Sequence, residues 1–137
     1  MSTTKGGCAC GAVRYDFTGD PMMMGHCQCR ACQRDSGTGH ASHVAVPSAG
    51  FGVTGPIKYW ESKADSGNMV SRGFCTECGS PVASKNSGMA QMMFVRAASL
   101  DDPAKFKPQF VVWNSMRQPW DRLDPALPSF ERMPPGV

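Results

Sequence analysis

The sequence predicts a mostly β protein, built from short strands and turns with at most one or two short helices. Its 137 residues include 15 glycines and 11 prolines, a high share that favours turns over long helices. Several short segments alternate apolar and polar residues with the period of two that marks half-buried strands. No internal repeat, low-complexity tract or domain boundary is visible, so we expect residues 1–137 to form a single domain.

The alternation is clearest near the N-terminus. In residues 12–17, the apolar residues Val13, Tyr15 and Phe17 are separated by charged ones, as in a half-buried strand. A turn follows, and the three methionines at residues 22–24 predict a short buried strand.

The remaining strand candidates lie between glycines, prolines and polar stretches. They are residues 40–46, 51–53, 57–61, 69–74, 82–84, 90–96 and 109–114. Residues 62–68 read as a polar loop, and a short helix is expected over residues 104–106 because Pro103 suits a first helical turn. A proline-rich tail follows residue 118, and four of its apolar residues are expected to pin it to the body: Trp120, Leu123, Leu127 and Phe130.

The charge and hydropathy of the chain exclude some classes of partner. The net charge of +3, from 14 basic and 11 acidic residues, is too small and too scattered to predict binding to nucleic acid or to a membrane surface. No apolar run approaches the length of a membrane span, and the segment Met1–Lys5 contains no apolar signal. Reduced thiols without an export signal predict a cytoplasmic protein.

Seven cysteines are the strongest chemical signal in the sequence. They form two pairs and a triplet: Cys8 and Cys10, Cys75 and Cys78, and Cys27, Cys29 and Cys32. Each pair is followed directly by a glycine, which tolerates the tight turn that lets backbone amides point at sulfur. We therefore expect the two pairs to be matched halves of one closed, structural zinc site. The triplet predicts a second zinc with an open position, the usual arrangement of a catalytic zinc.

Disulfides are the alternative use of these cysteines. The odd number of cysteines, the close Cys-x-Cys spacings and the absence of a signal peptide all argue against disulfides. Two Zn²⁺ ions per chain are the expected cofactors.

The open position of the triplet zinc has several candidate occupants. They are water, a substrate atom, or one of the histidines of the strand candidate at residues 40–46, His40 or His43. His26 adjoins Cys27, and neighbouring side chains in an extended backbone point apart, so His26 is not expected to bind the same metal.

Six stretches of the sequence together resemble a known family. They are residues 6–15, 27–32, 74–81, 99–102, Trp120 and residues 127–131. In this order they are similar to the glutathione-dependent formaldehyde-activating enzymes (GFA), a family that also includes centromere protein V-like proteins. The resemblance implies the Mss4-like fold, a small folded β-sandwich. It also implies a structural zinc on the two pairs and a catalytic zinc on the triplet.

The activity that the resemblance implies is the addition of the glutathione thiol to formaldehyde. The product is S-hydroxymethylglutathione, and the reverse reaction is that of a carbon–sulfur lyase. A zinc with a vacant position can hold a substrate thiol as thiolate or polarise a small carbonyl, so the chemistry suits the triplet. The family commonly has histidine between the first two triplet cysteines, where this chain has Gln28. By their positions, Arg30, Arg34 and Lys85 are candidates to bind the carboxylates of glutathione.

Two other functions remain open on the sequence. One is a structural two-zinc domain that binds a protein partner. The other is a zinc enzyme, such as a hydrolase, that acts on a different small molecule. The sequence does not indicate an oligomeric state.

Overall fold

The computed structural model describes residues 2–134, and these residues form two β-sheets. The smaller sheet is antiparallel and contains β1 (Thr3–Gly7), β2 (Arg14–Thr18) and β5 (Phe51–Thr54), in the order β1-β2-β5. The alternation seen in residues 12–17 is the reason for β2, because Tyr15 and Phe17 are buried and their neighbours are exposed.

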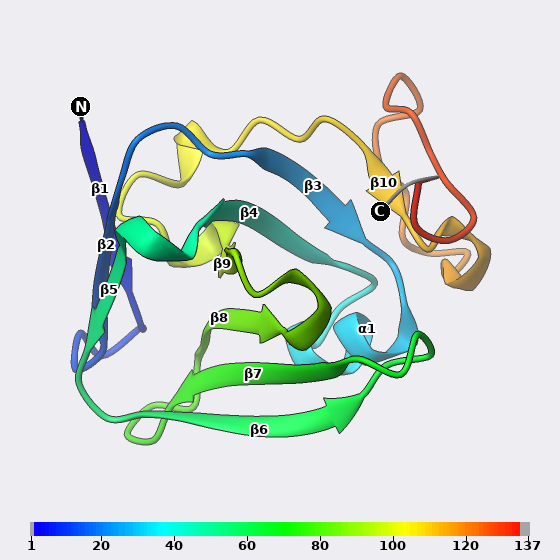
Figure 1. The fold of residues 1–137 in the computed structure, drawn as a ribbon. Helices are drawn as coiled ribbons and strands as arrows, with labels where there is room; N and C mark the ends of the chain where they lie inside the picture. The colour runs from blue at the N-terminus through cyan, green and yellow to red at the C-terminus, as the bar shows by residue number, and fades with distance from the viewer. Residues whose placement is uncertain (1, 135–137) are drawn as a thin grey trace.

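The larger sheet has seven strands in the order β10-β3-β4-β9-β8-β7-β6. Its strands are β3 (Met23–Cys27), β4 (Ala41–Pro47), β6 (Ile57–Lys63), β7 (Met69–Cys75), β8 (Pro81–Asn86), β9 (Met92–Arg96) and β10 (Val111–Val112). All neighbours are antiparallel except β10 and β3, which run parallel. The sheet is curved, with β3 and β4 on one side of the arch and β6 and β7 on the other (Figure 1).

The core lies between the two sheets. Side chains of the smaller sheet, including Tyr15 and Phe17, pack against alternate residues of the larger one, such as Val44 and Val46 on β4. Because side chains alternate along a strand, the residues between these, such as His43, lie on the other face of the larger sheet. That second face carries the candidate site described below.

One α-helix, α1 (Arg30–Ser36), lies near the open side of the arch, away from the smaller sheet (Figure 1). Cys29 caps its start, because its sulfur accepts a hydrogen bond from the Cys32 backbone N–H. Gly37 ends it in the left-handed conformation, with φ of 77°. Five short 3-10 segments complete the described structure: η1 (Ser48–Gly50), η2 (Ser87–Met89), η3 (Ala97–Ser99), η4 (Pro103–Lys105) and η5 (Asn114–Met116).

The mostly β fold predicted from the sequence is confirmed, and most strands lie where the alternation placed them. Several local predictions were wrong. The helix expected over residues 104–106 is the 3-10 segment η4, and the last strand is only Val111–Val112. Residues 62 and 63 belong to β6 rather than to a loop. Met22 is 53% exposed, and Trp120 is 65% exposed instead of pinning the tail.

The sequence analysis missed β1 and α1. The segment Thr3–Gly7 has no apolar alternation, and it becomes a strand because β2 offers it a full antiparallel partner from Thr18 to Arg14. The helix has no apolar face of helical period, and it depends on its two caps and on the burial of Cys32 and Gln33. Among the helices of the described residues, none is long and apolar enough to cross a membrane.

The tight packing around Gly6 of β1, against Tyr15 of the neighbouring strand and Ser99 of η3, provides a test of the fold. A Cβ at Gly6 would meet the hydroxyl of Tyr15 and the backbone oxygen of Ser99, and neither can move freely because Tyr15 is buried and its hydroxyl bonds Ser99 Oγ at 2.7 Å. We expect Gly6→Ala to destabilise the protein by about 1–3 kcal/mol through overpacking. The measurement is urea unfolding. The matched control is Gly52→Ala on β5, where the nearest atom is an Asp16 oxygen at 3.5 Å. Equal stability of the two variants would contradict this account of the packing.

Candidate metal centre and pocket

The two cysteine pairs come together in one group. The sulfur atoms of Cys8, Cys10, Cys75 and Cys78 all lie within 4.8 Å of one another. Cys8 and Cys10 follow β1 of the smaller sheet, whereas Cys75 ends β7 of the larger one. The sulfurs of Cys10 and Cys75, which are 65 residues apart in the sequence, lie 3.8 Å from one another. This tetrad therefore joins the two sheets.

Both halves of the tetrad are tight turns with the same features. The Gly11 N–H donates to the Cys8 carbonyl at 3.2 Å, and the Gly79 N–H donates to the Cys75 carbonyl at 2.8 Å. Both glycines have positive φ, 82° and 77°, which a residue with a side chain rarely adopts. Backbone N–H groups point at sulfur in each half, from Val13 to Cys8 at 3.2 Å and from Glu77 to Cys75 at 3.3 Å. Such donors stabilise negative charge on sulfur.

The triplet forms the second group. Cys27 ends β3, Cys29 caps α1 and Cys32 lies in its first turn, and their three sulfurs lie within 4.8 Å of one another. Cys32 is buried, and the other two are partly exposed. The structure thus divides the seven thiols into the same two groups that the sequence analysis proposed.

The electrostatics of both groups favour a bound cation. Hydrogen bonds from the Cys27 thiol and then from Cys32 lower the pKa of Cys29 to about 2, despite its burial. The bond with Cys29, the bond with Cys32 and burial in turn raise the pKa of Cys27 well above its ordinary value. In the tetrad, hydrogen bonds from Ser80 lower the pKa of Cys78 to about 5. In each group the pKa of some thiols is thus lowered and that of others, Cys27 and Cys10, is raised. Full ionisation therefore needs a positive ion between the sulfurs, as a thiolate-bound metal provides.

The triplet lies in the wall of a pocket of about 500 Å³, whereas the tetrad does not line it. The pocket covers the face of the larger sheet that points away from the core, and all seven strands contribute. Much of its wall is apolar, with Phe94, Phe110, Val112 and Trp113 among the lining residues. The tetrad lies outside the pocket and the triplet lies in its wall, so the two groups can serve different purposes.

The cations of the pocket differ from those expected. Arg30 and Lys85 line it, but Arg34 is exposed on α1 and is absent from the lining. Sequence reasoning missed Arg72, a buried arginine of β7 that does line the pocket. A signal for it exists, because Arg72 shares a strand face with Val70, and a charged residue at such a position needs a reason.

His43 lies beside the triplet without joining it. Its Nε2 is 3.7 Å from the sulfur of Cys32, but the three thiols alone form the group of close ligand atoms. The Arg96 Nη1 lies 3.0 Å from Nδ1 and 3.4 Å from Nε2 of the same ring, so it sits over the ring rather than in its plane. Arg96 is itself buried and forms an ion pair with Asp35 of α1. Burial lowers the pKa of His43 to about 4, which keeps the imidazole neutral at pH 7.

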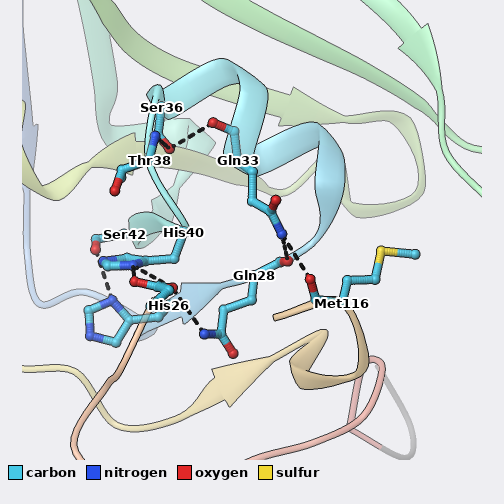
Figure 2. Close-up of polar contacts among 9 residues, drawn as sticks. His26, Gln28, Gln33, Ser36, Thr38, His40, Ser42 and Met116 are labelled. Carbon is cyan, nitrogen blue, oxygen red and sulfur yellow. Dashed lines mark hydrogen bonds and ion pairs between the residues drawn. The ribbon is translucent and has the colours of Figure 1, made fainter. Parts of the chain in front are cut away.

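His40 faces a different partner. Its Nδ1 contacts both carboxylate oxygens of Asp121, at 3.0 and 3.1 Å, and its ring meets the His26 ring edge-on at 4.8 Å. Asp121 also accepts a hydrogen bond of 3.0 Å from Nε2 of Gln28, the buried residue between Cys27 and Cys29. Figure 2 shows Gln28 and the two histidines close together beside α1. Asp121, which the sequence analysis did not single out, thus supports the loop of the triplet.

A second side chain holds the same loop to the C-terminal part of the chain. The buried Gln33 of α1 donates from Nε2 to the carbonyls of Gln28, at 2.8 Å, and Met116, at 3.0 Å (Figure 2). Its Oε1 accepts from Gln118 at 3.3 Å. The loop that carries the triplet is therefore fixed from both sides by amide groups.

These features define a mostly β protein with two cysteine groups that can each hold a metal ion, one of them in the wall of a pocket. The family model described as glutathione-dependent formaldehyde-activating enzyme matches residues 3–116, so the chain belongs to that family. The resemblance noted in the sequence is thereby confirmed.

A solved structure has a similar fold. The crystal structure of a Rhodobacter sphaeroides protein is 16% identical in sequence, with a TM-score of 0.58. The match covers 92% of this chain and 98% of that one. At this identity the similarity concerns the fold alone. The sequence matches no curated protein.

The tetrad should be essential for stability. Because its thiols join the two sheets, we expect Cys78→Ser to lose one metal ion per chain and roughly 3 kcal/mol or more of stability. Metal content by mass spectrometry and the thermal midpoint are the measurements. Glu77→Gln is the matched control, since the Glu77 side chain is exposed and only its backbone meets the tetrad. A Cys78→Ser protein with the wild-type melting temperature and metal content would exclude a metal at the tetrad.

The support by Asp121 can be tested separately. We expect Asp121→Ala to cost about 1–3 kcal/mol, because Gln28 is buried and loses its partner. Urea unfolding measures the loss, and Asp20→Ala, at an exposed residue between β2 and β3, is the control. If the two variants are equally stable, Asp121 does not support the loop.

Proposed function

We propose that this protein is a zinc-dependent enzyme of the carbon–sulfur lyase type. It forms or cleaves the adduct of a small thiol and a carbonyl compound, such as S-hydroxymethylglutathione. Membership of the formaldehyde-activating family supports this proposal. The observation that carries it is the position of the triplet, whose three thiols open into a pocket large enough for a small substrate.

Two zinc ions per chain are part of the proposal. Cys8, Cys10, Cys75 and Cys78 would hold a structural zinc, and Cys27, Cys29 and Cys32 would hold a catalytic one. The donor sets fit zinc because all seven are thiols, and backbone N–H groups already stabilise charge on the sulfurs of Cys8, Cys29 and Cys75. When bound at the triplet, zinc would favour the thiolate form of a substrate thiol at neutral pH.

The chain's own residues would position the reactants. The apolar wall of the pocket displaces water from the substrate and brings it to the triplet. The Cys32 N–H, at 3.3 Å from the Cys29 sulfur, holds that thiolate in place. With its proton on Nε2, neutral His43 donates a hydrogen bond towards the Cys32 sulfur at 3.7 Å. A triplet with a purely structural role would not need this pocket, so the enzyme is favoured over a protein-binding zinc domain.

In this proposal the protein acts in the cytoplasm and takes its substrates from there. Seven free thiols suit a reducing compartment, where glutathione and related thiols are abundant.

The test is the rate of adduct formation. S-Hydroxymethylglutathione formed from glutathione and formaldehyde is followed by NMR for the zinc-loaded wild type, for Cys29→Ser and for a blank without protein. We expect adduct formation to be faster with the wild type than in the blank. With Cys29→Ser the rate should equal that of the blank, because this variant lacks one thiol of the triplet and keeps the tetrad.

Arg34→Gln, on the exposed side of α1, is the matched control and should keep the wild-type rate. A wild type no faster than the blank would reject glutathione and formaldehyde as substrates. Retention of the full rate by Cys29→Ser would reject the triplet as the active centre.

A further inference from the structure

The pocket contains a buried cation whose role the proposed reaction does not explain. Arg72 of β7 is 8% exposed and lines the same pocket as the triplet. Arginine is rarely buried to this degree without an anionic partner. Its surroundings therefore indicate what the pocket is built to bind.

The strand register directs Arg72 into the pocket. In the antiparallel ladders, Arg72 stands opposite Trp60 on β6 and opposite Ser84 on β8. Ser84 in turn stands opposite Phe94 on β9. Residues opposite one another share a face of the sheet, and both Ser84 and Phe94 line the pocket. Arg72 is thus part of a row of side chains across the pocket floor.

The partners of Arg72 carry no charge. Its Nη1 donates to Ser62 Oγ at 3.0 Å, and its guanidinium lies 5.7 Å from the centre of the Trp60 ring. The other arginine of the core region is different, because Arg96 is paired with Asp35. Within residues 2–134, Arg72 forms no ion pair with a carboxylate. A planar donor fork that faces a pocket without a carboxylate partner suits an anion from outside the chain.

One alternative is that Arg72 only offsets the negative charge of the triplet. Its charge does lower the pKa of Cys29, after the larger effects of the neighbouring thiols. However, no hydrogen bond joins its guanidinium to a triplet sulfur among the described contacts. If the offset were its role, loss of Arg72 would affect every thiol substrate equally.

We infer that Arg72 binds the carboxylate of the thiol substrate and makes the pocket selective for thiols that carry one. This inference rests on the proposed function, because it assumes that a thiol enters the pocket. The arrangement separates two tasks, with the substrate's sulfur at the triplet and its carboxylate at β7. Glutathione has such a carboxylate, and so does a simple mercapto acid.

The experiment compares two probes of nearly the same shape, 3-mercaptopropionate and its neutral amide, 3-mercaptopropionamide. Their binding to the zinc-loaded protein is measured by calorimetry without any carbonyl compound. We expect the wild type to prefer the carboxylate. Arg72→Met should weaken carboxylate binding about tenfold or more and leave amide binding unchanged, as for the loss of a charge-assisted hydrogen bond. Arg72→Lys should restore part of the preference because it keeps the charge without the fork.

Lys58→Met is the matched control, since it removes an exposed positive charge from the neighbouring strand outside the pocket. Zinc content and circular dichroism establish that each variant is folded. Equal weakening of both probes by Arg72→Met would overturn the inference, as would a wild type without preference for the carboxylate.

Binding without turnover keeps this test apart from the test of the reaction. A carboxylate preference that depends on Arg72, together with no acceleration of adduct formation, would support carboxylate binding by Arg72 and reject the proposed reaction. Catalysis of adduct formation by a wild type that binds both probes equally would support the proposed reaction and reject carboxylate binding by Arg72.

Discussion

The mutual repulsion of clustered thiolates is the constraint on which this structure depends. Four sulfurs from two different sheets lie within 4.8 Å of one another, and three more do so in the pocket wall. Neither group ionises fully without a positive ion, as the raised pKa of Cys27 indicates for the triplet and that of Cys10 for the tetrad. The fold therefore brings the sulfurs together and supplies N–H donors, but the last contribution must come from a cation. This constraint applies both to the tetrad, which joins the two sheets, and to the triplet in the pocket wall.

Much of the fold could be predicted because its physical signals are local. Alternation in β2 reports one buried face, and a glycine after each cysteine pair reports a tight turn. The division of the thiols into four and three was visible for the same reason. The helix α1 was not, because its stability comes from a cysteine cap and a buried glutamine rather than from an apolar stripe.

The residues that hold the triplet loop and line the pocket floor could not be predicted from the sequence, for another reason. Asp121 and Gln28 are 93 residues apart, and no periodic pattern links an acid in a proline-rich tail to an amide between two cysteines. The same applies to the row that contains Arg72, because strand register across the sheet decides which side chains share the pocket floor. Spacing identified the cysteines that could hold metal ions, whereas only the three-dimensional structure reveals what surrounds them.

The two edges of the larger sheet are finished in different ways. At β10 the chain covers its own edge, because Val111 bridges to Ser129 of the tail. The other edge is β6 (Figure 1). Its exposed charged residues include Lys58, Glu61 and Lys63. Addition of a foreign strand there would bury these charges, which discourages edge-to-edge aggregation. In the described structure, the edge at β6 therefore stays unpaired beside residues 62–66, which line the pocket, and its charges oppose strand pairing with a second copy of the chain.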